Sequence, residues 1–319
     1  MSANRFLDLI DKVDNVPLDF SAVSHEPYYG LFLSPSYKLP HGYIHPATLS
    51  KLKLPPTFTV SHDNRTVTLD GPLAGVSPTQ HINAALQQVV DSAIEANTFP
   101  NLNKTHSEPF RILGATGEDD IVQLERFAAP LFGIATRGAH MTCYTRTEAD
   151  GDLKIWVAKR SKHLYSHPGK LDSTVAGGVK ASDSPTSCIL AEAMEEASLP
   201  SSLVHRSAQA TGVLTLANRN PKSGLFHSEI LYVYDMELPA DVVPSPGDDE
   251  VEEFVLMDVE EMKQRMVDGE FKPNVCPVMV DFLIRHGHVT ADTEGEGMYV
   301  EICRRLRRRL PVPIRAGAS

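Results

Sequence analysis

The segment from Gly177 to Leu199 constrains this chain more than any other, because it places three glutamates shortly after a Gly-Gly pair. Glu192, Glu195 and Glu196 are spaced i, i+3 and i+4, so in a helix their carboxylates share one face. The opposite face would be apolar and available for packing: Ile189, Leu190, Ala193, Met194 and Ala197. The segment therefore predicts an amphipathic helix whose polar side is purely acidic.

This predicted helix has well-marked ends. Ser184 suits the N-cap and Pro185 the first helical position, while Pro200 disfavours helical geometry at the residue before it. The glutamates then lie in the last turns, where the helix dipole disfavours carboxylates and like charges cost roughly 0.2–0.5 kcal/mol per pair. A divalent cation would offset both penalties, and oxygen ligands suit Mg²⁺ or Mn²⁺. A solvated acidic face is the alternative that these residues alone leave open.

The composition excludes several classes of protein. The 319 residues are 42% hydrophobic and 22% charged, as in soluble globular proteins. A net charge of −11 argues against a general nucleic-acid binder, and no apolar run approaches the roughly 18–20 residues that span a membrane. The four cysteines form no zinc-like spacing and the N-terminus has no targeting character. We therefore expect a cytoplasmic protein with reduced thiols, whose oligomeric state the sequence leaves open.

The first third of the chain indicates a small α+β domain. Two helices and a hairpin are expected, at residues 3–14, 78–97 and 57–70 respectively. A polar, glycine-containing break at Gly114–Asp120 then precedes a change of texture toward strands. We predict an N-terminal domain of unassigned role at residues 1–118 and a second domain at residues 119–319.

The second domain is predicted to be α/β or α+β. Strands are expected at Ala139–Thr147, Leu153–Arg160, Glu229–Met236 and Phe254–Met257. The first two are joined by Glu148-Ala149-Asp150-Gly151, whose Asp-Gly pair favours a hairpin turn. Besides the acidic helix, helices are expected at Asp258–Asp268, Val275–His286 and Tyr299–Arg309. The arginines of the last helix are expected to be solvated or paired with acids.

The acidic segment resembles the Nudix box, G-x5-E-x7-R-E-U-x-E-E-x-G-U, in which U is a bulky aliphatic residue. Gly177 stands at the leading glycine, Asp183 at the first glutamate and Leu199 at the terminal aliphatic position. The three helix glutamates stand at the remaining glutamates of the box. The chain departs from the pattern where the box has its arginine, its middle aliphatic and its late glycine: Ala191, Ala193 and Ser198.

Other segments make this resemblance more specific. WVAKRS, HPGKLDSTVAGG, ERFAAPLFGIATRGAH, DEVEEFVLM, FKPN and DFLIRHG, which lie between residues 125 and 287, are similar to the thiamin pyrophosphokinase-related Nudix proteins of fungi and plants. The resemblance implies a Nudix α/β/α sandwich with a mixed sheet, preceded by a smaller α+β domain. It covers roughly residues 120–315 and is weaker before them. We expect the N-terminal domain to roof the active site.

The resemblance also implies an enzymatic activity. Members of this branch hydrolyse thiamin diphosphate and, preferentially, damaged forms such as oxo- and oxythiamin diphosphate, which yields a monophosphate and phosphate. One alternative is a Nudix hydrolase that acts on ADP-ribose, a nucleotide sugar or a dinucleotide. Another is a Nudix-fold binding module without turnover. In each case the expected partner is a small diphosphate, and neither nucleic acid nor a membrane is expected.

The expected site residues follow from this chemistry, since hydrolysis of a diphosphate needs neutralised phosphoryl oxygens and a positioned water. The metal ligands are expected to be Glu192, Glu195, Glu196 and the backbone carbonyl near Gly177. Glu196 or Glu192 is expected to deprotonate the attacking water, and the acidic loop offers Glu250 and Glu253 as further candidates. Arg160 and Lys162 follow a predicted strand and are expected to contact diphosphate oxygens.

Overall fold

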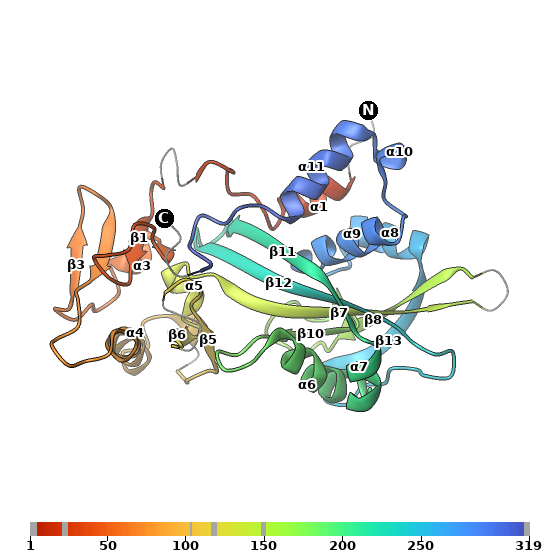
Figure 1. Cartoon of the computed structure of the whole chain (residues 1–319), viewed down its shortest axis with the longest axis horizontal. Coiled ribbons are helices and arrows are strands. Elements are labelled where there is room, and N and C mark those ends of the chain that lie inside the picture. The colour runs from red at the N-terminus through yellow and green to blue at the C-terminus, as the bar shows by residue number, and fades with distance from the viewer. Residues whose placement is uncertain (1–4, 21–24, 103, 116–119, 148–150, 316–319) are drawn as a thin grey trace.

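The computed structural model describes residues 5–20, 25–102, 104–115, 120–147 and 151–315. These residues form a four-stranded sheet, a seven-stranded sheet and a two-stranded ribbon. Figure 1 shows the four-stranded sheet at one end of the molecule and the long strands of the larger sheet at the other. Among the described residues, no helix combines the length and the apolar character that a bilayer crossing requires.

The N-terminal region is built on the smaller sheet, whose strand order is β2-β1-β4-β3. Its strands are β1 (Tyr29–Phe32), β2 (Gly42–Ile44), β3 (Phe58–Ser61) and β4 (Thr66–Leu69). The helices beside it are α3 (Pro46–Leu49), α4 (Pro78–Glu95) and the 3₁₀ turn η1 (Pro100–Leu102). The apolar face of α4 packs into one buried cluster with these strands. The expected hairpin and the expected long helix of this region are both confirmed.

A short ribbon joins this region to the larger sheet. It consists of β5 (Pro109–Arg111) and β6 (Gln123–Glu125), which pair antiparallel, followed by α5 (Ala129–Phe132). An isolated bridge pairs Phe110 with Lys180, two residues after the Gly-Gly pair. The ribbon therefore brings the N-terminal region beside the acidic helix.

The larger sheet is mixed. Its main order is β11-β12-β7-β8-β13, with β10 paired to β7 and β9 paired to β8. Only the β12–β7 pair is parallel among the described pairs of this sheet. The strands are β7 (Thr136–Arg146), β8 (Leu153–Arg160), β9 (Leu171–Asp172), β10 (Val175–Gly178), β11 (Gln209–Arg219), β12 (Phe226–Glu237) and β13 (Val251–Asp258). The predicted β7–β8 hairpin is confirmed, while three of its four predicted turn residues, 148–150, lie outside the described residues.

Helices cover both faces of this sheet, as Figure 1 shows. One face carries α6 (Pro185–Ala197) and α7 (Ser201–Ser207). The other carries α1 (Arg5–Asp11), α8 (Val259–Val267), α9 (Cys276–Arg285), α10 (Ala291–Glu294) and α11 (Glu296–Leu306), with the 3₁₀ turn η2 (Pro273–Val275) before α9. The expected α/β/α sandwich, preceded by a smaller α+β region, is thus observed.

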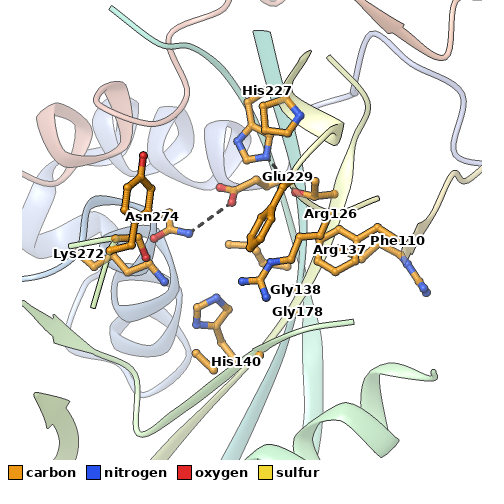
Figure 2. A pocket seen from close by; sticks show the side chains of 18 of the residues that line it. Phe110, Arg126, Arg137, Gly138, His140, Gly178, His227, Glu229, Lys272 and Asn274 are labelled. Atoms are coloured by element: carbon orange, nitrogen blue, oxygen red, sulfur yellow. Dashed lines mark hydrogen bonds between the residues drawn. The ribbon is translucent and has the colours of Figure 1, made fainter. Parts of the chain in front are cut away.

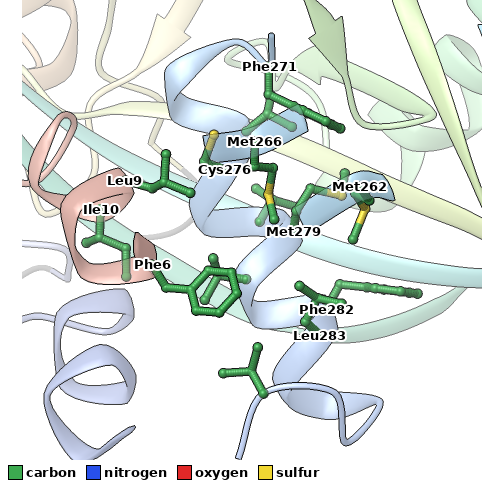
Figure 3. Close-up of a cluster of buried hydrophobic side chains, with 14 of the residues drawn as sticks. Phe6, Leu9, Ile10, Met262, Met266, Phe271, Cys276, Met279, Phe282 and Leu283 are labelled. Atoms are coloured by element: carbon green, nitrogen blue, oxygen red, sulfur yellow. The ribbon is translucent and has the colours of Figure 1, made fainter. Parts of the chain in front are cut away.

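The first helix belongs to the core of the second region. Figure 3 shows Phe6, Leu9 and Ile10 of α1 packed against side chains of α8 and α9, which include Met266 and Met279. The buried Asp14 follows α1 and pairs with Arg305 at 2.6 Å and with Arg308 at 2.9 Å. Residues before 118 therefore contribute to both cores, and the division at 118/119 stays a prediction.

Candidate functional site

The acidic helix α6 forms as its sequence requires. The Ser184 hydroxyl accepts a hydrogen bond from the backbone N–H of Ser187, the Ser187 hydroxyl accepts one from the N–H of Ser184, and Pro185 occupies the first turn. The helix ends at Ala197, and Ser198 adopts a left-handed conformation with φ of 53°. A residue other than glycine is strained there, so Ser198 keeps the backbone turn that the late glycine of the box would make.

The three glutamates of α6 differ in burial more than their shared face suggests. Glu196 is 7% exposed, and its Oε2 accepts a hydrogen bond of 3.0 Å from the backbone N–H of Ala176. Glu192 is half-buried, whereas Glu195 is exposed. Met194, expected on the packed face, is 55% exposed. The acidic face therefore turns two of its carboxylates inward and leaves one in solvent.

The Gly-Gly pair allows close approach to this face. A side chain at Gly177 would place its Cβ 2.2 Å from Glu192 Oε1, and a Cβ at Gly178 would lie 2.7 Å from Cζ of Phe110. Only glycine leaves room for both neighbours. The Gly177 backbone thus lies directly beside the Glu192 carboxylate.

These residues open onto a cavity of about 640 Å³. Its floor is made by alternate residues of two strands, which point to the same side of the sheet. Thr136, Gly138 and His140 come from β7, and His227, Glu229 and Leu231 come from β12, with Thr136 directly beside Glu229. Figure 2 shows His140, His227 and Glu229 around this space, with Lys272 and Asn274 at one side. The N-terminal region, the ribbon and α5 supply a further wall: Pro100, Asn101, Phe110, Arg126, Phe127 and Pro130.

The two inward glutamates are difficult to ionise. Burial, followed by repulsion from Glu195 and Glu250, raises the pKa of Glu192 to about 7. Burial also raises the pKa of Glu196 well above its ordinary value, and Glu192 adds to the effect, although the Ala176 N–H opposes it. Among the described side chains, no lysine, arginine or histidine forms an ion pair with either. Both carboxylates would therefore be stabilised by a cation placed between them and the cavity.

The nearby Asp172 shows the opposite behaviour. Burial opposes its ionisation, but Lys272, His140 and Arg160 together hold its pKa below the ordinary value. Lys272 Nζ lies 3.3 Å and Arg160 Nη1 3.2 Å from Asp172 Oδ2. The charge of Asp172 is thus compensated by Lys272 and Arg160, two cationic side chains that line the cavity.

The structure brings together only part of the predicted site. Glu192, Glu196, Gly177, Arg160 and Glu250 line the cavity. Arg160 reaches it while its guanidinium also donates to Asp172 and to the Ser166 carbonyl.

The other predicted residues do not face the cavity. Glu195 is exposed, and Lys162 is 77% exposed, its Nζ lying 3.9 Å from Glu252 Oε1. Glu253 accepts a hydrogen bond of 2.7 Å from Lys159. None of these three is among the described residues that line the cavity.

Sequence reasoning did not assign a role to several residues that line the cavity: Phe110, Arg126, Glu229, Lys272 and Asn274. Arg126 lies over the Phe110 ring, 5.7 Å from its centroid, and its Nη1 contacts Glu108 Oε1 at 2.5 Å. A signal existed for three of these residues, because ERFAAP contains Arg126 and FKPN contains Lys272 and Asn274. No local pattern marks Glu229.

A divalent cation fits part of this arrangement. Within the described ranges, no three His, Cys, Asp or Glu side chains converge as a preformed metal site. Glu192 and Glu196 nevertheless offer oxygen donors, which Mg²⁺ and Mn²⁺ prefer, and neither has a protein cation as partner. Mg²⁺ keeps several waters and binds through one or two carboxylates, so an incomplete protein cage is no obstacle.

Two family models match the chain. The NUDIX domain model matches residues 136–275, and a domain of unknown function, DUF4743, matches residues 40–136. The first match contains the cavity floor and α6, and the second contains Phe110 and Arg126.

Relatives are found in fungi and plants. An uncharacterized protein of Saccharomyces cerevisiae is 29% identical over 97% of this chain and 92% of its own length. Nudix hydrolases 20 and 24 of Arabidopsis thaliana, both named as chloroplastic, are 37% and 36% identical over 58% of this chain. The chain spans about half the length of these two plant relatives, 48% in each case.

Solved structures are more distant. A Deinococcus radiodurans protein, DR0079, is 20% identical with a TM-score of 0.37 and is matched over 51% of this chain and 91% of its own.

Proposed function

We propose that this chain is a Nudix hydrolase that cleaves a diphosphate bond with Mg²⁺ or Mn²⁺, which is supported by the NUDIX domain match and by the similarity to two plant Nudix hydrolases. The observation that carries this proposal is the pair Glu192 and Glu196. Both carboxylates face the cavity, both have a raised pKa, and neither forms an ion pair with a described lysine, arginine or histidine, although Lys180 and Arg126 act on Glu192 from further away. A metal ion would stabilise the charge of both.

The chain's own residues have distinct roles in this proposal. Glu192, Glu196 and the Gly177 carbonyl would hold the cation, which when bound neutralises phosphoryl charge and acidifies a water. The Ala176 N–H binds Oε2 of Glu196, and among the described residues no hydrogen bond to its Oε1 is found. Arg160, already oriented by Asp172, donates to diphosphate oxygens. Glu192, Glu196 or the cavity-lining Glu250 accepts the proton of the attacking water.

We propose a thiamin diphosphate-like substrate, in particular oxo- or oxythiamin diphosphate. Its support is the resemblance of the segments around the box to the thiamin pyrophosphokinase-related branch. A cavity of about 640 Å³ lies within the 300–1,000 Å³ range of small-ligand sites. The residues 1–118, proposed as a separate domain, would roof this cavity through Phe110.

A substrate panel tests the proposal. Phosphate release is measured with Mg²⁺ for thiamin, oxothiamin and oxythiamin diphosphates, ADP-ribose, a nucleotide sugar and a dinucleotide. We expect the highest kcat/KM for a thiamin-type diphosphate and no turnover after chelation of divalent cations. A higher kcat/KM for ADP-ribose or a nucleotide sugar would contradict the proposed thiamin-type substrate and identify that compound class instead. Turnover that survives chelation would contradict the metal assignment.

A further inference from the structure

Glu229 is a carboxylate in the cavity floor whose position the proposed hydrolysis does not use. It lies on β12 beside Thr136 of β7, on the strand face that lines the cavity. The residue is half-buried, and among the described residues it forms no ion pair with lysine, arginine or histidine. A half-buried carboxylate without a cation is costly unless something in the cavity donates to it.

Asn274 holds Glu229 from the side. It lies in the 3₁₀ turn η2, and its Nδ2 donates to Glu229 Oε1 at 3.4 Å, the contact that is dashed in Figure 2. The same amide has a buried Oδ1 that meets no donor among the described residues. Because that Oδ1 is buried, the acceptor that a ligand can reach is the Glu229 carboxylate, and a ligand with N–H groups or positive charge would pair with it.

The surroundings suit a flat ring. Leu231 is two residues along β12 on the same face as Glu229, and Pro130 of α5, a helix that packs on β12, also lines the cavity. Phe110 and Phe127 add aromatic surface from the N-terminal side. This apolar surface beside an oriented carboxylate is typical of sites that bind small organic molecules, while the cationic lining residues Arg126, Arg137, Arg160 and Lys272 belong to the same cavity.

We infer that Glu229, oriented by Asn274, recognises the organic part of the substrate as a nitrogen heteroaromatic that carries an amino group or a positive charge. This inference rests on the proposed function, because it assigns the ring end of the same diphosphate. A hydrogen bond to the Glu229 carboxylate would favour a ring that carries a donor over one that does not, because a bound ring without a donor leaves the carboxylate desolvated and unpaired. Glu229 is thus a specificity residue, and Asn274 is a positioning residue.

The test uses monophosphates, which have no diphosphate bond to cleave. Binding of thiamin monophosphate, with its amino group and cationic ring, is compared by calorimetry with binding of 2-phenylethyl monophosphate, which has neither. We expect the wild type to prefer the first at least about tenfold, as one charged hydrogen bond allows. In Glu229→Gln the preference falls to about twofold or less, and Asn274→Ala lowers it by a smaller factor.

A matched control is Glu237→Gln, since Glu237 is an exposed acid on the same strand and pairs at 3.9 Å with Arg146. It keeps the wild-type preference. A wild type without preference, or a preference that survives in Glu229→Gln, would overturn the inference. The circular dichroism of each variant separates loss of recognition from loss of fold.

The two proposals fail in different ways. If the enzyme hydrolyses diphosphates but shows no preference between the two monophosphates, the proposed role of Glu229 is wrong and the proposed hydrolysis stands. A ring preference that Glu229→Gln abolishes, with no turnover of thiamin-type diphosphates, would keep the ring site and remove the proposed substrate.

Discussion

Glu196 lines the cavity and Asp172 lies behind two cations that line it; the two carboxylates are 7% and 3% exposed, and their pKa values shift in opposite directions. Asp172 faces Lys272, Arg160 and His140, so its charge is matched within the protein. Glu196 has a backbone N–H and the further carboxylates Glu192, Asp172 and Glu250 as neighbours. Burial alone therefore does not set the state of either group.

The comparison separates two uses of a buried acid. A carboxylate that the protein neutralises contributes to the fold, and its loss leaves cations unpaired. A carboxylate that the protein leaves without a cation contributes little to the unliganded fold and is available to a ligand. Substitutions at these positions should accordingly affect different measurements.

The largest effect is expected for Glu196→Gln. Replacement of the carboxylate by an amide of equal size removes a proposed metal ligand, and we expect kcat to fall about 10³-fold, equal to about 4 kcal/mol. The unfolding free energy of the metal-free protein should not fall, because repulsion with Glu192 disappears. Steady-state kinetics and urea unfolding check the two outcomes.

Glu195→Gln sharpens the same prediction, since Glu195 is the exposed glutamate of α6. A comparable loss of kcat would show that all three glutamates hold the metal. Wild-type rates in Glu196→Gln would contradict the metal assignment altogether.

The second effect is a loss of stability in Asp172→Asn. The amide cannot neutralise Lys272 and Arg160, which are left partly buried, so we expect a loss of about 3 kcal/mol in the free energy of unfolding. Urea denaturation measures it, and Asp249→Asn, at a residue that is 88% exposed, should change it by less than about 0.5 kcal/mol. Equal stability of Asp172→Asn and the wild type would break the comparison.

The third effect concerns Gly177→Ala. Its methyl group would meet the Glu192 carboxylate at 2.2 Å, so the carboxylate must move away from its place beside the Gly177 backbone. We expect kcat/KM to fall about 10²-fold, which corresponds to about 2.7 kcal/mol. Gly71→Ala is the control, because a Cβ at Gly71 meets no atom within 4 Å, and its kcat/KM should equal that of the wild type.

The smallest effect is a pH dependence of stabilisation by Mg²⁺. The pKa of Glu192 is raised to about 7, so without metal its contribution to stability is present at low pH and is lost as pH rises through about 7. Mg²⁺ binds the ionised form, so its gain in Tm should be larger at pH 8 than at pH 6. Each kcal/mol corresponds to about 3 °C in Tm.

Differential scanning calorimetry with and without Mg²⁺ measures this difference. In Glu192→Gln the gain from Mg²⁺ should be smaller and should change less between pH 6 and pH 8 than in the wild type, because only Glu196, whose pKa is also raised, remains to titrate. If Mg²⁺ raises the Tm of the wild type equally at both pH values, Mg²⁺ binding does not require the deprotonation of Glu192.

The α6 helix could be predicted because local rules decide it: spacing, an N-cap serine and a proline at each end. Periodicity predicts which face of a helix a residue occupies but not how deeply its side chain is buried, so the difference in burial between Glu195 and Glu196 was not predictable. Strand β11 was missed, since the bulge between Ala210 and Gly212 interrupts its alternation. Glu229 and Phe110 reach the cavity through pairings between distant segments, which no window of the sequence contains.

The ion pairs of Asp14 have a consequence for how the chain is made. A ribosome adds Asp14 291 residues before Arg305 and 294 residues before Arg308. Phe6, Leu9 and Ile10 likewise find their neighbours in α8 and α9 only after the strands of both sheets have been synthesised. Contacts of such long sequence separation form slowly, so the first helix must wait for most of the chain before it can dock. During translation, its apolar face is a natural binding site for a chaperone.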